Sequence, residues 1–216
     1  MAFSRTHFIR HRPWLYHYTN PSNLESLVRR REMLSARVWV LEANQFRQQV
    51  PDVDAFLGTA RGEQFPLEIG ENSIVMLNDQ IPLRNREKFA SLRGTYEDYI
   101  RCLNNKIFFW AGDANRPITK RGLAHTFAER YAHYGCLRIP TEDVWSETES
   151  PLRFCTCNSG APQARDRIER GPHIFKAHDD DCIRLKKVSE TVVENRLVLP
   201  PTVEWQYPLH SQWRAL

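Results

Sequence analysis

The chain has 216 residues, 41% hydrophobic and 26% charged, a composition typical of a protein that builds its own core and not of a disordered or fibrous one. Its apolar runs fall far short of the roughly 20 residues that a membrane-spanning helix needs, and its basic first residues lack the apolar stretch of a signal peptide. We therefore expect a cytoplasmic protein with no membrane partner, whose net charge of +4 permits a nucleic-acid or dinucleotide partner without requiring one.

The first elements are predicted from side-chain alternation and capping residues. Residues 1–13 are basic and irregular and predict an N-terminal arm, followed by a single domain over 14–216. Trp14–Thr19 alternates polar and aromatic residues, which predicts a strand. Asn20 before a proline is typical of a helix start, because asparagine caps well and proline suits the first helical position. Ser35–Leu41 is a second strand candidate.

Later elements are predicted from short apolar runs and helical spacing. Residues 44–72 favour a helix plus a loop. Strands are predicted over 74–77, 107–110, 136–139, 153–157, 185–193 and 197–205, helices over 95–104 and 119–134, a helical turn over 141–145, and a loop over 161–172. Short strands interleaved with helices favour an α+β domain over a regular βαβ array. Neither a Rossmann fingerprint nor a Walker loop is present in the sequence.

Arginine supplies 24 of the 30 basic residues. A GC-rich genome would explain that bias, and a need to hold phosphates or bases would explain it equally well. The predicted loop over 161–172 carries Arg165, Arg167 and Arg170. Such a run is either a solvated surface or a grip on the phosphates of NAD or of a nucleic acid.

The five cysteines are an odd number, which favours reduced thiols. Cys155 and Cys157 lie two residues apart on a predicted strand and would point to the same face. His173 and His178 follow but do not complete a zinc spacing. We therefore predict buried structural cysteines and no metal site.

The most informative segment is the first strand, where His17 and Thr19 share a face. An imidazole and a hydroxyl aimed into a cleft can hold a ribose by directed hydrogen bonds, and a helix start just behind, at Asn20, would add free N–H groups for a phosphate. The ordinary alternative is a structural histidine with its hydrogen bonds satisfied inside the fold.

Several motifs resemble the ADP-ribosyltransferase-like fold, especially its DarT-like branch and related uncharacterised bacterial families. The similar segments are L-Y-H-Y-T at 15–19, N-L-E-S-L at 23–27, M-L-S at 33–35, L-N-D-Q at 77–80 and L-N-N-K-I-F-F-W at 103–110. The resemblance implies an α+β fold with a split β-sheet or β-sandwich, flanking helices and a cleft that binds NAD in a bent form.

The resemblance also implies roles for particular residues. His17, Thr19 and Asn20 would hold NAD at the first strand, and Phe108, Phe109 or Trp110 would stack on nicotinamide. A late strand-borne carboxylate would stabilise the positive charge that develops on the ribose when the glycosidic bond breaks. Glu190 matches that catalytic position, and Glu194 is the competitor.

Three hypotheses of function follow. The leading one is an NAD-dependent ADP-ribosyltransferase, a toxin or anti-phage effector that modifies DNA, RNA or a protein and has an antitoxin protein as a further partner. The second is a nucleic-acid-binding module on the same fold without transfer activity. The third is an RNA 2′-phosphotransferase-like enzyme that shares the NAD cleft.

Overall fold

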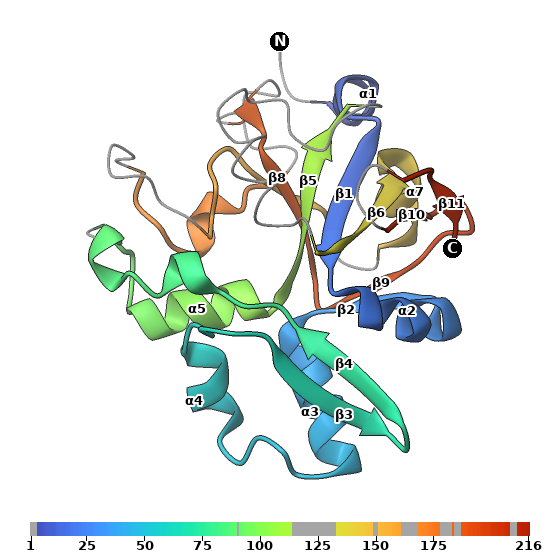
Figure 1. Ribbon diagram of the computed structural model, residues 1–216. Coiled ribbons are helices and arrows are strands. Elements are labelled where there is room, and N and C mark those ends of the chain that lie inside the picture. Colours follow the sequence, from blue (N-terminus) through green and yellow to red (C-terminus); the bar gives the residue numbers. More distant parts are fainter. Residues whose placement is uncertain are drawn as a thin grey trace.

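A computed structural model describes residues 4–89, 91–113, 133–148, 151–160, 168–177, 183, 187–207 and 211–216 (Figure 1). Its α-helices are α1 (Arg5–His11), α2 (Leu24–Arg30), α3 (Ala36–Phe46), α4 (Val53–Gly58), α5 (Tyr96–Asn104) and α7 (Thr141–Glu147). Its strands are β1 (Trp14–Thr19), β2 (Glu32–Leu34), β3 (Phe65–Gly70), β4 (Ser73–Leu77), β5 (Lys106–Gly112), β6 (Gly135–Pro140), β7 (Arg153–Cys155), β8 (Glu190–Glu194), β9 (Arg196–Val198), β10 (Glu204–Gln206) and β11 (Arg214–Ala215). Short 3₁₀ turns are η1 (Pro21–Asn23), η2 (Ile81–Leu83), η3 (Arg86–Lys88) and η4 (Pro172–Ile174).

The main sheet has seven strands in the order β11-β10-β6-β1-β5-β8-β7, and all its described pairings are antiparallel. One face buries a core that includes Leu15, Phe109, Leu137 and Phe154. The other face, over β5, β8 and β7, packs against α5 through Phe108, Val192 and Ile100. The predicted α+β class is therefore confirmed.

The sheet opens between its two central strands. β1 pairs with β6 along its whole length, from Trp14 to Thr19, but with β5 only from Trp14 to Tyr16. Beyond that point β5 stays paired with β8, so the two halves of the sheet separate. The imidazole of His17 replaces the missing backbone partner, because its Nδ1 lies 2.9 Å from the carbonyl oxygen of Phe108.

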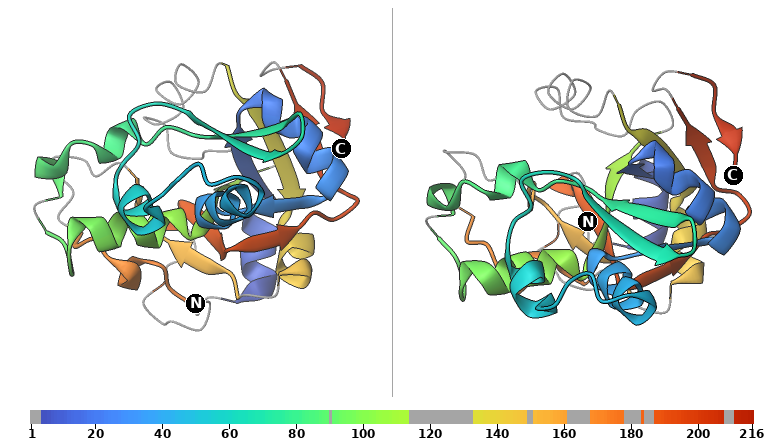
Figure 2. Two further views of the ribbon diagram at one scale, coloured as in Figure 1. Left: turned by 90° about the horizontal axis from the view of Figure 1, so that it is seen from below. Right: turned by 60° about the horizontal axis from the view of Figure 1, so that its bottom comes forward.

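A smaller lobe, α3, α4 and the β3–β4 hairpin, lies beyond the ends of β1 and β5 at which the sheet opens (Figures 1 and 2). Trp39, Val40, Leu57, Leu67 and Val75 are among the residues of its own core. Asn23 ties this lobe to the sheet, because its amide contacts Met76 on β4 and the hydroxyl of Thr19 on β1.

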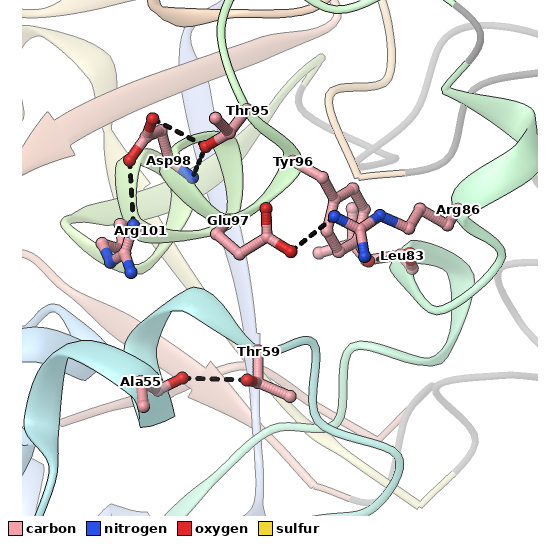
Figure 3. Close-up of polar contacts among 9 residues, drawn as sticks. All are labelled: Ala55, Thr59, Leu83, Arg86, Thr95, Tyr96, Glu97, Asp98 and Arg101. Atoms are coloured by element: carbon pink, nitrogen blue, oxygen red, sulfur yellow. Dashed lines mark hydrogen bonds and ion pairs between the residues drawn. The ribbon is translucent and has the colours of Figure 1, made fainter.

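Local capping chemistry explains where several helices begin. Asn20 caps η1, its carboxamide oxygen accepting from the N–H of Ser22 at 2.9 Å. Thr95 caps α5 by accepting from the N–H of Asp98, whose carboxylate also pairs with Arg101 one turn later (Figure 3). Both helix starts were predicted from the sequence, and both are confirmed.

Several predictions of local structure are wrong, among them the single strand over 197–205, where β9 ends at Val198 and β10 begins at Glu204. Residues 5–11 form α1 instead of an irregular arm, because Phe8 is buried against Trp145 and Phe154. The segment 35–41 is the cap and start of α3, because Trp39, Val40 and Ala43 recur at helical spacing and bury in the small lobe. β8 starts at Glu190, so that residue begins the strand instead of lying near its centre.

The helix predicted over 119–134 lies almost wholly outside the described residues, and its end at 133–134 is a turn. None of the helices among the described residues is long and apolar enough to cross a membrane.

Candidate functional site

A cavity of about 450 Å³ lies where the sheet opens, between β1, β5 and the small lobe. Its wall includes side chains from β1, β5, β4, the segment 78–83 and the turn at 158–160, with the first residue of β8. The volume falls in the range of about 300–1,000 Å³ that is usual for small-molecule sites.

The structure brings five of the predicted site residues to this one cavity: His17, Thr19, Phe109, Trp110 and Glu190. Phe109 is fully buried and its ring centroid lies 5.8 Å from that of His17, so it supports the histidine. Trp110, the next residue along β5, is only partly buried. Of Phe109 and Trp110, two of the predicted stacking residues, Trp110 is therefore the more exposed.

His17 is a neutral imidazole at pH 7. Burial lowers its pKa from the ordinary 6.5 to about 4, against a smaller raising effect of the hydrogen bond to Phe108. A carbonyl oxygen can only accept, so Nδ1 carries the proton and donates it to Phe108. Nε2 is then an acceptor, suited to a ligand hydroxyl.

The lowered pKa of His17 makes the stability of the fold depend on pH. The unfolded chain binds a proton at this residue below about pH 6.5, whereas the native state does so only near pH 4. The contribution of His17 to the free energy of unfolding is therefore complete above about pH 6.5 and is lost as the pH falls towards 4. We expect denaturant unfolding to show about 1–2 kcal/mol more loss of stability between about pH 7 and pH 5 in the wild type than in His17→Asn.

The matched control for that measurement is His7→Asn, which changes an exposed histidine on α1. His7→Asn should keep the wild-type pH dependence. If His17→Asn also keeps it, His17 is not held as a neutral group in the native state.

Glu190 begins β8 opposite Trp110 and is only 4% exposed. Its Oε2 accepts a hydrogen bond of 3.1 Å from the backbone N–H of Ser159. Glu194 differs in every respect: its side chain is 46% exposed, it pairs with Lys106 at 3.2 Å, and it does not line the cavity. The geometry therefore favours Glu190 over its competitor.

Thr19 and Asn20 have different surroundings. The hydroxyl of Thr19 lines the cavity and accepts from the amide of Asn23 at 2.8 Å, which leaves its own proton to donate. Asn20 caps η1, donates to Gln64 at 2.8 Å and does not line the cavity. The structure thus shows Asn20 as a cap outside the cavity, and its predicted role in binding NAD stays a prediction.

Of the three arginines of the predicted loop over 161–172, only Arg170 can be described, because Arg165 and Arg167 lie outside the described residues. Arg170 is 1% exposed, and its guanidinium donates to the carbonyl oxygens of Ile168 and Asn158. In this structure the Arg170 side chain is therefore enclosed by the fold, and its contact with a nucleic acid stays a prediction.

Cys155 and Cys157 are buried with their thiols 3.3 Å apart, as predicted for structural cysteines on one face. Across the described ranges, no group of three or more His, Cys, Asp or Glu side chains could hold a metal ion.

A second part of the cavity wall, called the far wall below, consists of Arg61, Asn78, Asp79, Asn104 and Tyr134, polar residues for which the sequence predicted no role. Arg61 donates from Nε to the carbonyl of Asn78 and from Nη1 to the side chain of Asn104, both at 3.1 Å. Burial lowers its pKa to about 10, against the raising effect of Asp79, so the guanidinium stays charged at neutral pH. Asp79 in turn accepts from the hydroxyl of Tyr134.

The site thus combines a neutral imidazole, an accessible indole, a nearly enclosed carboxylate and a cation on the far wall. These groups suit a ligand that has hydroxyls, a flat ring and a negative charge. No sequence spacing indicates the far wall, because Arg61 lies in an irregular segment and Tyr134 at the far end of a predicted helix.

The chain belongs to a protein family of unknown function, DUF7002, whose family model matches residues 13–198. Neither a curated protein nor a solved structure matched the sequence.

Proposed function

We propose that this member of the DUF7002 family is an ADP-ribosyltransferase that takes NAD as its substrate and transfers ADP-ribose to a macromolecular acceptor. One observation carries the proposal: His17, Trp110 and Glu190 line a single cavity at the point where β1 and β5 part. The resemblance to the ADP-ribosyltransferase-like split sheet implies the same three groups around one cleft.

The cavity residues fit NAD group by group. Nε2 of His17 accepts from a hydroxyl of the nicotinamide ribose, and the Thr19 hydroxyl donates to another. The indole of Trp110 stacks on the nicotinamide ring. Arg61, whose Nη2 has no hydrogen-bond partner among the described residues, faces the diphosphate.

Glu190 supplies the electrostatic part of the reaction. The bond between ribose C1′ and the nicotinamide nitrogen breaks with its electron pair passing to the nicotinamide, which leaves neutral. Positive charge develops on the ribose, and the nearly enclosed carboxylate stabilises it. The acceptor atom then bonds to C1′ and releases its proton.

The proposal predicts a binding defect on removal of the imidazole. His17→Ala should weaken NAD binding by about 1–3 kcal/mol, because a ribose hydroxyl loses its partner in a partly buried site. Titration calorimetry measures the change, and thermal unfolding checks that the variant is folded.

His7→Ala, on the exposed face of α1, is the control and should bind NAD as the wild type does. Unchanged affinity in a folded His17→Ala protein would overturn the placement of the ribose at β1.

A further inference from the structure

One peptide group lies between two buried charges. Nη2 of Arg170 donates to the carbonyl oxygen of Asn158 at 3.2 Å, and the N–H of Ser159 donates to Oε2 of Glu190 at 3.1 Å. That carbonyl and that N–H belong to the same peptide bond. In a trans peptide they point in opposite directions, so the cation and the anion occupy the two ends of one dipole.

The turn that carries this peptide is held on several sides. The hydroxyl of Tyr99 on α5 donates to the carbonyl of Ser159 at 2.8 Å. The backbone of Arg170 accepts from the N–H of Arg93 and donates to the carbonyl of Ser91. A peptide fixed in this way cannot rotate to serve another partner without breaking several hydrogen bonds.

The charge at both ends is nearly enclosed, since Arg170 is 1% and Glu190 4% exposed. Buried charges are costly unless they are paired or hydrogen-bonded. Among the described residues, the titratable groups that interact with the carboxylate include Tyr99 and Cys155. Burial raises the pKa of the Tyr99 phenol, and the hydrogen bond to Cys157 followed by burial raises that of the Cys155 thiol, so both are neutral at pH 7. His17, in the same cavity, is neutral as well.

We infer that Arg170 is a positioning residue for Glu190: through the Asn158–Ser159 peptide it aims the carboxylate into the cavity and keeps it ionised. A cation polarises the carbonyl, which strengthens the N–H at the other end of the peptide as a donor. The inference rests on the proposed function only in giving Glu190 a catalytic task. The coupling between Arg170 and Glu190 is a property of the fold and can be measured without activity.

The kinetic test compares Arg170→Met with the wild type in nicotinamide release from NAD. We expect kcat to fall about 10-fold at neutral pH with KM for NAD little changed, because the cation acts on the carboxylate and not on the bound substrate. The acidic limb of the kcat profile should move up by about one pH unit, since loss of a nearby cation favours the protonated carboxyl. Arg170→Lys keeps the charge, so its kcat and the position of its acidic limb should lie close to those of the wild type.

Arg31→Met is the matched control. Like Arg170, Arg31 donates to two backbone carbonyls, those of Pro200 and Leu216, and does not line the cavity, but neither carbonyl belongs to the Asn158–Ser159 peptide. Its loss should lower stability and leave the kcat profile where it is. An Arg170→Met profile that coincides with those of the wild type and Arg31→Met would overturn the inference.

A double-mutant cycle in unfolding separates this inference from the proposed function. Arg170→Met should raise the unfolding equilibrium constant, and the factor of this rise should be at least about 10-fold smaller when Glu190 is already glutamine, because the carboxylate that the cation supports is then gone. Additive effects overturn the inference even if NAD is a substrate; strong coupling supports it even if no nicotinamide is released. Should Arg170→Met fail to fold, Arg170→Gln, which removes the charge but keeps an N–H donor, is run through the same cycle with the same two outcomes.

Discussion

Replacement of Glu190 by glutamine is expected to lower the rate of nicotinamide release from NAD by about 100-fold or more while leaving NAD binding nearly intact. Glutamine keeps the size of the side chain and an oxygen for the N–H of Ser159. It lacks the negative charge that stabilises the developing ribosyl cation, and loss of one such group has effects of this size.

The matched variant is Glu194→Gln, four residues along the same strand. Glu194 is exposed and paired with Lys106, so its replacement should leave nicotinamide release unchanged. If Glu194→Gln alone abolishes release, the catalytic assignment moves to that residue. If both variants retain full activity, β8 does not supply the catalytic carboxylate.

An ADP-ribosyltransferase effector would also harm its host, so Glu190→Gln should relieve toxicity on expression.

Replacement of Arg61 by methionine is expected to raise the dissociation constant for NAD by about 10–100-fold, the loss of one to two hydrogen bonds to a charged group. ADP-ribose, which keeps the diphosphate, should lose affinity to the same extent, and Arg61→Lys should recover part of it. Titration calorimetry with both ligands gives the comparison.

The control for Arg61 is Arg47→Met, because Arg47 lies in the same lobe with an exposed side chain paired to Glu68. Arg47→Met should bind both ligands as the wild type does. Equal affinity of folded Arg61→Met and wild type for NAD would mean that the diphosphate lies elsewhere, although His17 and Glu190 could still act on the ribose.

Local chemistry accounts for the parts of the fold that the sequence predicted correctly. Thr95 and Asn20 have capping side chains that act within three residues, so no distant contact is needed to recognise them. The error over 35–41 has the opposite cause: a short apolar run suits a strand or a helix alike. What decides for a helix is the burial of Trp39 and Ala43 against the β3–β4 hairpin, a contact distant in sequence.

The residues of the candidate site likewise fall into those that the sequence predicted and those that it did not. His17 and Glu190 could be found because they sit on strands with a familiar motif or context. Arg61 and Tyr134 could not, because tertiary folding alone brings their segments to one cavity. Arg170 lies in a charged run that suggested a solvated loop, and only the structure shows its side chain turned inward to Asn158.

The most direct test of the account is to incubate the purified wild-type chain with NAD labelled separately in its nicotinamide and adenine halves, in the presence of DNA, RNA and cell protein. The account predicts that the wild type releases labelled nicotinamide and that the adenine label becomes attached to one class of macromolecule, with Glu190→Gln inactive in both respects. Intact NAD after prolonged incubation, together with no NAD binding by calorimetry, would contradict it.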